Sequence, residues 1–418
     1  MLTKAPKGTK DALPEVSYKW QYVERLIREI CASYGYQEIR TPVFEHTELF
    51  QRGVGDTTDV VQKEMYTFED KGGRSITLRP EGTAGVARSF IENSLYAGPQ
   101  PTKMYYLTSC YRYEKPQKGR LREHHQFGVE VFGAESPSID AEIISLAMTL
   151  YQKIGVKGLE LRINSIGCPE CRAAYHQKLK AYLKSYLNDV CSTCMERYEK
   201  NPLRILDCKS EKCHGIAQNA PIILDSLCHD CQTHFDGLKT YLDHMNIAYS
   251  IDPFIVRGLD YYTRTVFEIV SKDIGAQESV GGGGRYDKLI EQLGGPSTPG
   301  IGFGLGIERL LLTLEAQGIT IPQPEPTQLF IANIGEKAGI KAQSLVFELR
   351  KHGIRADKDH MGKSLKAQMK YADKLAVRYT MVLGEDEINS GSAKLKDMET
   401  GDVQAVVLDE LAEILGRL

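Results

Sequence analysis

The chain has 418 residues, so at about 150 residues per domain we expect two or three domains. Its hydrophobic fraction of 42% and charged fraction of 26% suit a folded protein with a buried core, and its formal net charge of −3 excludes nucleic-acid binding by bulk charge alone. No apolar run approaches 18 residues, and the start MLTKAPKGTKDALPE lacks an apolar signal core, so we expect neither a membrane span nor secretion.

The N-terminal third mixes helices and strands. One face of a predicted helix, which Gly35 ends, carries Trp20, Val23, Ile27, Ile30 and Tyr34. The next stretch, QEIRTPVFE, is predicted to be extended with a break at Pro42. A second helix is predicted over 143–154, and strands at MYYLTSCYRYE, HQFGVEVFG and RTVFEIV. The polar–apolar alternation of these strands predicts an antiparallel sheet with one functional face.

The segment TLRPEGTAGVARSF (77–90) predicts a turn followed by a helix. Pro80 and Gly82 make the turn, and Thr83 is expected to cap the helix through its hydroxyl group. Glu81 lies in the same turn. Its carboxylate is placed either to pair with an ammonium group or to be an ordinary surface charge.

Residues 104–133 are predicted to form a strand, a basic loop and a second strand. Arg112 ends the first strand, and the loop places Lys115, Lys118, Arg120 and Arg122 against Glu114 alone. In the second strand the period of two puts Gln126, Gly128 and Glu130 on one face, and Phe127, Val129 and Val131 on the other. This pattern favours either a site for a small polar ligand or a solvated hairpin.

The composition changes between Cys168 and Tyr249, where helical stretches such as AAYHQKLKAYLKSYL predict an insertion. Eight of the ten cysteines form close pairs here: Cys168/Cys171, Cys191/Cys194, Cys208/Cys213 and Cys228/Cys231. Two pairs make one tetrahedral site, so the eight thiolates are enough for two structural Zn²⁺; reduced thiols and disulfides are the alternatives. His214, His229 and His234 lie nearby as other potential ligands, whereas Cys31 and Cys110 are expected in the core.

Three segments after the insertion carry further candidate site residues. In RGLDYYTRTVFEIV (257–270), Arg257 precedes Asp260, Tyr261 and Tyr262, a set that suits a polar anionic substrate or a structural tyrosine pair. The run GGGGRYDKLI (281–290) indicates either a backbone that approaches a ligand closely or a flexible turn.

The segment GIGFGLGIERLLLTL (300–314) puts four alternating glycines on one strand face, namely Gly300, Gly302, Gly304 and Gly306. Glycine weakens a strand, so the presence of four glycines on one face requires an explanation. Either a flat ligand ring lies against it, with Arg309 in the following helix over the ring or the phosphates, or another strand approaches closely. Beyond it, ITIPQPEPTQ (319–328) predicts a stiff linker, and alternating strands and helices predict a small α/β domain.

Together these segments resemble the class II aminoacyl-tRNA synthetases, and specifically the histidyl-tRNA synthetase family, over nearly the whole chain. TPVFEHTELF (41–50) resembles the class motif of the dimer interface, 104–133 the second motif and GIGFGLGIERLLL the third. RGLDYYTRTVFE and GGGGRYDKL resemble the two peptides special to the histidine enzyme. KSLKAQMKYADKLAVRYTMVLGEDE resembles part of that family's anticodon-binding domain.

The resemblance implies an α+β catalytic domain, built on an antiparallel sheet flanked by helices, from residues 1–167 and 250–320. It implies a mainly helical insertion at 168–249, the linker at 319–328 and an α/β anticodon-binding domain at 329–418. The implied activity is ATP-dependent ligation of L-histidine to its cognate tRNA through a histidyl-adenylate, with Mg²⁺, by a cytoplasmic homodimer without a membrane partner. Zinc is not required by the family.

The resemblance also implies roles for individual residues. Arg112, Arg257 and Arg309 are the expected catalytic residues. ATP is expected to contact Arg112, Glu114, Arg257, Gly304 and Arg309. Histidine is expected to contact Glu81, Gly82, Thr83, Arg112, Gln126, Glu130, Arg257, Tyr261 and Tyr262. Within that set, Glu130 and Tyr262 would meet the imidazole nitrogens, and Glu81 and Thr83 the α-ammonium group.

The tRNA contacts are expected where positive charge gathers. Loop 113–123 would meet the acceptor end. Residues 337–378 hold eleven basic and four acidic side chains, which suggests either RNA contact or a solvated helix face. Two rival hypotheses are the non-catalytic paralogue that regulates ATP phosphoribosyltransferase and a sensor that binds histidine or tRNA without catalysis. The histidine-specific peptides, the anticodon domain and the three arginines favour the ligase.

Overall fold

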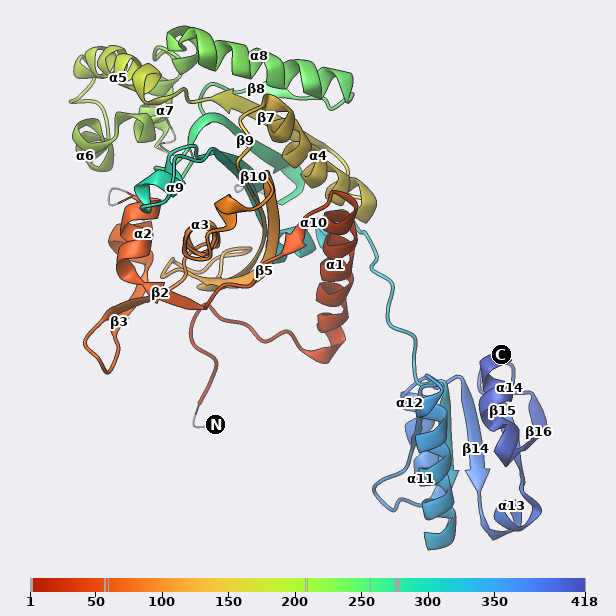
Figure 1. Cartoon of the computed structure of the whole chain (residues 1–418). Coiled ribbons are helices and arrows are strands. Elements are labelled where there is room, and N and C mark those ends of the chain that lie inside the picture. Colours follow the sequence, from red (N-terminus) through yellow and green to blue (C-terminus); the bar gives the residue numbers. More distant parts are fainter. Residues whose placement is uncertain are drawn as a thin grey trace. The chain divides into compact units, whose positions relative to one another are not determined.

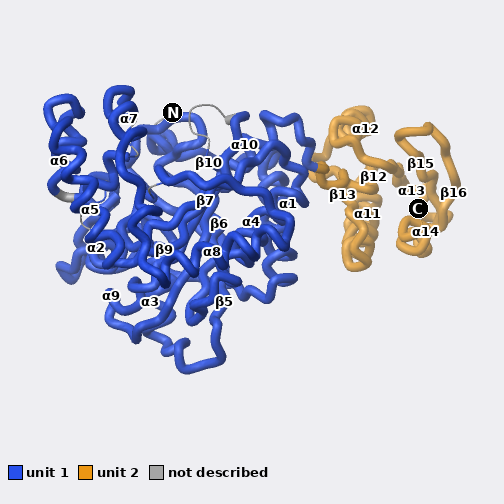
Figure 2. Tube along the Cα trace, turned by 90° about the horizontal axis from the view of Figure 1, so that it is seen from above, with its two compact units in different colours: residues 1–321 blue, residues 322–418 orange. Residues whose placement is uncertain are grey.

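The computed structural model describes residues 3–55, 58, 60–206, 208, 210–255, 257–274 and 279–417. The chain divides into two compact units, Met1–Ile321 and Pro322–Leu418 (Figure 2). None of the helices in this described part combines the length and apolar character that crossing a membrane requires.

The first unit is built on an eight-stranded sheet (Figure 1). In spatial order its strands are β1 (Gln37–Glu38), β5 (Thr102–Tyr111), β6 (Glu123–Phe132), β11 (Gly300–Gly306), β10 (Ser279–Arg285), β9 (Thr263–Ser271), β7 (Leu159–Ser165) and β8 (Ser250–Ile251). The six central strands are antiparallel, as predicted, while the short edge strands β1 and β8 pair in parallel. The sheet joins strands from both sides of the cysteine-rich segment.

One face of this sheet is sealed by helices. They are α1 (Pro14–Ser33), α4 (Pro137–Ile154), α8 (His229–His244) and α10 (Ile307–Ala316). In α1 the buried Val23, Ile27 and Ile30 recur at helical spacing, as predicted, and pack on the apolar side of the strands. Phe127 and Phe303 point into the same core from β6 and β11. The opposite face of these two strands is therefore left for polar side chains.

The other face carries α3 (Thr83–Glu92), which lies within the curve of the sheet in Figure 1, and α9 (Leu289–Gln292). A three-stranded antiparallel sheet of β2 (Phe44–His46), β4 (Ser75–Leu78) and β3 (Tyr66–Glu69) accompanies α2 (Thr47–Val54). Pro42 lies between β1 and β2, where the break was expected.

The segment expected as an insertion is helical, with α5 (Pro169–Lys184), α6 (Ser192–Lys200) and α7 (Glu211–Ala217) preceding α8. Its core residues Tyr175, Leu179 and Leu183 belong to the same apolar cluster as Tyr261 and Tyr262. The whole segment lies within the first compact unit. Its standing as a domain of its own, at 168–249, stays a prediction.

The second unit is a five-stranded sheet flanked by helices. Its strands, in spatial order, are β13 (Ala356–Lys358), β12 (Leu329–Asn333), β14 (Tyr379–Leu383), β15 (Ser392–Asp397) and β16 (Val403–Val407). Its helices are α11 (Glu336–Lys351), α12 (Leu365–Lys374), α13 (Glu385–Ser390) and α14 (Leu411–Arg417). β13, β12 and β14 are parallel, so the predicted α/β alternation is confirmed. The proline-containing stretch 322–327 has no helix or strand.

Candidate functional site

A cavity of about 460 Å³ opens on the polar side of β6, β11 and β10, and Arg112, Arg257 and Arg309 all line it. Arg112 follows β5 directly, Arg257 precedes β9, and Arg309 lies in the first turn of α10. These positions are far apart in the sequence. The strand order brings them together, because β6 and β11 are neighbours and β10 and β9 lie next to them.

Each of the three guanidinium groups is held by a fixed partner. Arg112 Nε donates a hydrogen bond to the Pro80 carbonyl oxygen at 2.8 Å, and Arg309 Nη1 donates to the Ser279 carbonyl oxygen at 2.7 Å. Arg257 forms a close ion pair with Glu268. The Nε atom of Arg257 is buried and has no hydrogen-bond partner in the described part of the chain.

Five arginines and four glutamates line the cavity, and the arginines lie close enough to affect one another. Burial, followed by the charge of nearby Arg120, lowers the pKa of Arg309. Glu114 lines the same cavity and forms ion pairs with Arg120 at 3.0 Å and with Arg112 at 3.9 Å. Cations held this close favour a ligand that carries several negative charges, such as a polyphosphate.

A buried carboxyl group lies beside this cavity. Glu130 is 1% exposed and accepts hydrogen bonds from Thr83 Oγ1 at 2.7 Å, from Tyr106 Oη at 3.2 Å and from Tyr286 Oη. Burial raises the pKa of Glu130 to about 8, against the lowering effect of these hydroxyl donors. A perturbed acid in a polar cluster that adjoins a cavity is typical of a ligand site.

The N-terminus of α3 differs from the prediction. Thr83 is the first residue of the helix, and its hydroxyl donates to Glu130 instead of capping the helix. The helix is capped by the Glu81 carboxylate, which accepts from the backbone N–H groups of Thr83 at 2.7 Å and Ala84 at 2.8 Å. Glu81 is 3% exposed, so it is not a surface charge. The cap prediction for Thr83 is therefore wrong, because Thr83 lies inside the first turn and the Glu81 carboxylate takes the free N–H groups.

Gln126 links the cavity to the carboxyl cluster. Its side chain lines the cavity, and its Nε2 donates to Tyr106 Oη at 3.3 Å. The same tyrosine hydroxyl donates to Glu130. The predicted polar face of β6 is thus confirmed: Gln126 and Glu130 lie on the side of the site while Phe127 and Val129 lie in the core.

Tyr261 and Tyr262 are buried, with ring centroids 4.7 Å apart. Tyr286 lies 5.4 Å from the Tyr261 ring. Burial is the main cause of the raised pKa of Tyr262, and the charges of Glu130 and Glu81 add to it. The two tyrosines therefore belong to the carboxyl cluster and not to the lining of the arginine cavity.

The alternating glycines make room for site side chains. A Cβ atom on Gly302 would overlap Glu130 Oε2 and the Tyr286 hydroxyl, and one on Gly304 would overlap Gln126 Nε2. In β10, a Cβ on Gly282 would lie 3.0 Å from Arg257 Nη1. Gly306 differs, because nothing lies within 4 Å of its Cβ position and it lines the cavity. The glycine face is thus mostly covered by the protein's own side chains, and it is open to a flat ligand ring at Gly306.

The run 281–284 lies inside strand β10 in the middle of the sheet, so it is not a flexible turn. Gly82 lies against the Tyr106 ring, so a Cβ atom at this position would overlap that ring.

Four site residues carry no role in the sequence prediction. Tyr106 and Tyr286 hold Glu130, Glu268 pairs with Arg257, and His124 lines the cavity. Burial, followed by the charge of Arg112, lowers the pKa of His124 to about 3, so this histidine is neutral at ordinary pH. Tyr106 was accessible to sequence reasoning only through its period-two position on β5. Tyr286 is the second residue after the glycine run, which was the available signal.

The eight cysteines of the insertion do not line the cavity. They form two groups of four, each drawn from two of the predicted pairs. The second unit has a groove of about 1150 Å³, whose lining includes Phe347, Lys358, His360 and Lys363. Phe347 is 59% exposed. Several basic residues around it are already paired, for example Arg350 with Asp357 at 3.2 Å.

Comparisons with known proteins all point to the same family. A family model described as "Histidyl-tRNA synthetase" matches residues 8–310, and one described as "Anticodon binding domain" matches 328–418. A histidine–tRNA ligase of Caldanaerobacter subterraneus subsp. tengcongensis is 62% identical over 99% of this chain and 100% of its own length. The ligase of Acetivibrio thermocellus is 61% identical, with 98% and 99% covered.

Solved structures extend the likeness to the fold. The crystal structure of apo histidyl-tRNA synthetase from Staphylococcus aureus superposes with a TM-score of 0.85 at 42% identity, covering 99% of this chain and 100% of that one. A Bacillus halodurans structure described as an ATP phosphoribosyltransferase regulatory subunit/histidyl-tRNA synthetase has a TM-score of 0.65 at 22% identity and covers 88% of this chain and 96% of that one. At that identity the likeness concerns the fold alone.

Proposed function

Because the chain belongs to the histidyl-tRNA synthetase family, we propose that it is the ATP-dependent ligase that joins L-histidine to its cognate tRNA through a histidyl-adenylate. In the first step a histidine carboxylate oxygen attacks the α-phosphorus of ATP, and pyrophosphate leaves. In the second, a hydroxyl group of the terminal adenosine of the tRNA attacks the activated carbonyl carbon, and AMP leaves.

The observation that carries this proposal is the convergence of Arg112, Arg257 and Arg309 on one cavity beside a buried carboxyl cluster. Adenylation brings a carboxylate against a triphosphate, so the two anions need fixed positive charge to approach in line. A planar guanidinium group that is always charged suits that task. The unpartnered buried Nε–H of Arg257 supports its assignment, since a substrate oxygen would satisfy it.

We assign histidine to the carboxyl cluster. Glu130 and Tyr262 are the proposed partners of the imidazole nitrogens, Glu81 and Thr83 those of the α-ammonium group, with Gln126 and Tyr261 completing the site. Support comes from burial: paired polar groups without solvent discriminate strongly, because an amino acid that lacks matching groups would leave them unsatisfied. Gly82, where only a glycine leaves space for the Tyr106 ring, belongs to the same site.

ATP is assigned to the arginine cavity, with its base over the open backbone at Gly306, next to Gly304, and its phosphates toward Arg112 and Arg309. Mg²⁺ neutralises phosphate charge when it is bound with the nucleotide. The carboxylates of Glu114 and Glu268 line the cavity and offer the oxygen ligands that this ion takes. Both carboxylates also keep the arginines in position through their ion pairs.

The tRNA is assigned to two surfaces. In loop 113–123, Lys115 and Lys118 are exposed, while Arg122 stacks 3.7 Å from the Tyr113 ring centroid. In the second unit, the groove with exposed Phe347 suits stacking of unpaired bases. Lys366, Lys370 and Lys374 are exposed and recur every four residues along α12, which suits a phosphate backbone.

We further propose a homodimer located in the cytoplasm, where tRNA is charged for protein synthesis. The small sheet leaves apolar side chains uncovered in this single chain: Phe44 is 55% and Phe68 48% exposed. Phe44 lies in the segment that resembles the dimer motif. Zn²⁺ is proposed as a structural ion of the insertion with no part in the reaction.

The regulatory paralogue is the weaker hypothesis. The relatives at 61–62% identity are described as histidine–tRNA ligases over the full chain, and the anticodon-binding model matches 328–418. A sensor without catalysis would not need three arginines around one cavity.

The test is ATP–pyrophosphate exchange driven by histidine, followed by aminoacylation of a histidine tRNA transcript. We expect exchange with histidine and with no other amino acid. Glu130→Ala should abolish the exchange while the circular dichroism spectrum stays unchanged. Arg25→Ala, at an exposed position on α1, is the matched control and should keep full activity. Histidine-dependent exchange at the normal rate in the Glu130 variant would contradict the assignment of histidine to this cluster.

A further inference from the structure

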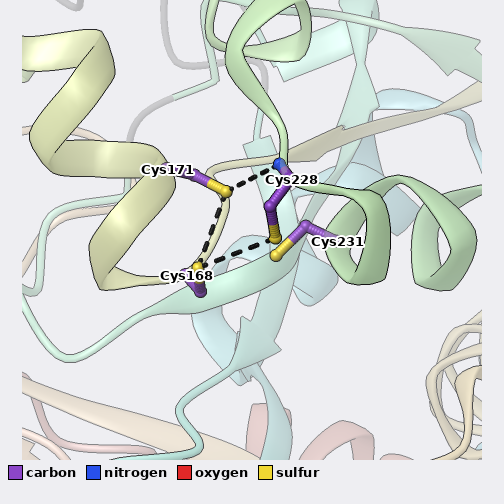
Figure 3. Close-up of side chains that lie close together, drawn as sticks. All are labelled: Cys168, Cys171, Cys228 and Cys231. Carbon is purple, nitrogen blue, oxygen red and sulfur yellow. Dashed lines mark hydrogen bonds between the residues drawn. The ribbon is translucent and has the colours of Figure 1, made fainter.

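The eight cysteines of the insertion form two sets of four, and along the chain the second set lies between the two halves of the first. Cys168 and Cys171 at the start of α5 face Cys228 and Cys231 at the start of α8 (Figure 3). The second set joins Cys191 and Cys194, at the start of α6, to Cys208 and Cys213. In each set the four sulfur atoms lie within 4.8 Å of one another.

The sulfur separations match a tetrahedral metal site. The Sγ atoms of Cys168 and Cys171 lie 3.5 Å apart, those of Cys168 and Cys228 4.0 Å, and those of Cys191 and Cys208 3.8 Å. Four thiolates about 2.3 Å from Zn²⁺ in a tetrahedron are about 3.8 Å from each other. A disulfide would bring two sulfurs to about 2.05 Å, and all ten cysteines are free.

In each set a backbone N–H group donates a hydrogen bond to a buried cysteine sulfur. The Cys228 N–H donates to Cys171 Sγ at 3.0 Å, and the Cys191 N–H donates to Cys213 Sγ at 3.2 Å. Such bonds favour the thiolate that a metal requires and orient it. In every pair the first cysteine is partly exposed and the second is buried, so an ion has a path of entry.

The two sets close the cysteine-rich segment at two places along the chain. The first joins residues that are 60 positions apart at the two ends of the cysteine-rich stretch, and the second closes a loop inside it. A stretch of about 60 residues is marginal in the apolar surface that it buries by itself, and a structural metal adds folding free energy to such a stretch.

Both sets also support the chain that carries Arg257, Tyr261 and Tyr262. Next to the first set, Arg172 Nη1 donates to the Tyr262 carbonyl oxygen at 3.1 Å, and the Arg264 N–H donates to the Gly167 carbonyl oxygen at 2.9 Å. Inside the loop closed by the second set, Asn201 Nδ2 donates to Asp260 Oδ1 at 3.2 Å and Arg204 Nη1 to the Gly258 carbonyl oxygen at 3.1 Å.

We propose that each set binds one Zn²⁺ through four cysteine thiolates and that the two ions hold the insertion against residues 258–264. The zinc sites stand on the cysteine geometry alone, whereas the effect on substrate binding rests on the function proposed above. The ions position the histidine-binding segment and take no part in adenylation.

The metal content of the full-length protein, purified without chelator and without added metal, tests the two sites. We expect two zinc per chain by elemental analysis. The double variants Cys168→Ser/Cys228→Ser and Cys191→Ser/Cys208→Ser should each keep one, and the matched control Cys31→Ser/Cys110→Ser should keep two. If a variant fails to fold, the wild-type protein reconstituted with Co²⁺ decides, because two tetrahedral tetrathiolate centres have a distinctive visible spectrum. Metal-free protein with eight titratable thiols, eight cysteines in disulfides, or iron in place of zinc would overturn the assignment.

Asn201→Ala tests the support of the active site. It should raise the KM for histidine in pyrophosphate exchange about tenfold with two zinc retained. Its control is Asn219→Ala, whose amide bonds only the Gly215 carbonyl oxygen and which should leave the KM unchanged. An unchanged KM in Asn201→Ala would overturn the positioning role. Zinc at two per chain without any histidine-dependent exchange would instead contradict the ligase function and leave the metal sites standing.

Discussion

The Thr83 hydroxyl group lies 2.7 Å from Glu130 Oε1, so a hydrogen bond joins the first turn of α3 to the last third of strand β6. This bond joins two residues 47 positions apart inside a cluster that solvent does not reach. The Glu81 carboxylate caps the same turn by accepting from the Thr83 and Ala84 N–H groups. Because Glu130 is buried in this cluster, its pKa is raised, and unfolding experiments at different pH values can detect that change.

We predict that Glu130→Gln changes how stability depends on pH. Burial raises the pKa of Glu130 to about 8 in the folded protein, above its ordinary value of 4.5. Between these values the folded protein holds the proton more tightly than the unfolded chain does, so the free energy of unfolding falls as pH rises from about 4.5 to about 8. Glutamine has no proton to lose. The free energy of unfolding of the variant minus that of the wild type should therefore grow over this range, by up to about 5 kcal/mol.

The measurement is thermal or urea unfolding of both proteins in a series of buffers. The difference should level off above about pH 8, where the folded carboxyl group is ionised. A difference that stays constant from acid to alkaline pH would show that Glu130 titrates normally in the folded protein.

The second prediction concerns Arg309, whose guanidinium lines the cavity and is fixed by the Ser279 carbonyl oxygen. Arg309→Ala should lower kcat of histidine-dependent exchange by about 10²- to 10³-fold, since it removes a fixed donor from the developing phosphate charge. Arg309→Lys should recover little of this, because an ammonium group lacks the planar fork. Steady-state exchange kinetics decide the matter, and full recovery by lysine would mean that only net charge is needed.

Two glycines of β11 should have separable roles. A methyl group at Gly302 would displace Glu130 and Tyr286, so Gly302→Ala should raise the KM for histidine. At Gly306 nothing blocks a methyl group except a ligand in the cavity, so Gly306→Ala should raise the KM for ATP and leave that for histidine unchanged. Gly215→Ala, in an open position on α7, is the control. Equal effects of the first two variants on both substrates would contradict the division of the site.

Charge reversal on α12 should act on tRNA alone. The triple variant Lys366→Glu, Lys370→Glu, Lys374→Glu is expected to raise the KM for tRNA at least tenfold and to flatten its salt dependence, because phosphate contacts release counterions. Pyrophosphate exchange needs no tRNA and should be unaffected. Lys394→Glu with Lys396→Glu, two exposed lysines on β15 of the same unit, is the matched control. Loss of aminoacylation in the control as well would point to a nonspecific charge effect.

Local patterns in the sequence determined much of the architecture. The spacing of Val23, Ile27 and Ile30 placed α1 on the core, and the period of two divided Glu130 from Val129, because backbone geometry alone sets both repeats. The resemblance supplied the residues around the site. No local pattern explained why β11 alternates glycine, or why a tyrosine at 106 matters.

The tertiary structure decided which side chains meet. The register that sets Gly302 beside Glu130 also shows that the missing Cβ makes room for that carboxylate and the Tyr286 hydroxyl. The outer cysteine pairs combine across the insertion, Cys168 with Cys228, while the two inner pairs combine with each other. Thr83 lies in the first turn of its helix and not at the cap position, so the Glu81 carboxylate accepts the free N–H groups while the Thr83 hydroxyl donates to the distant Glu130. Such choices depend on strand order and burial, which arise only when distant segments pack, so the sequence predicts the parts of this site better than their partners.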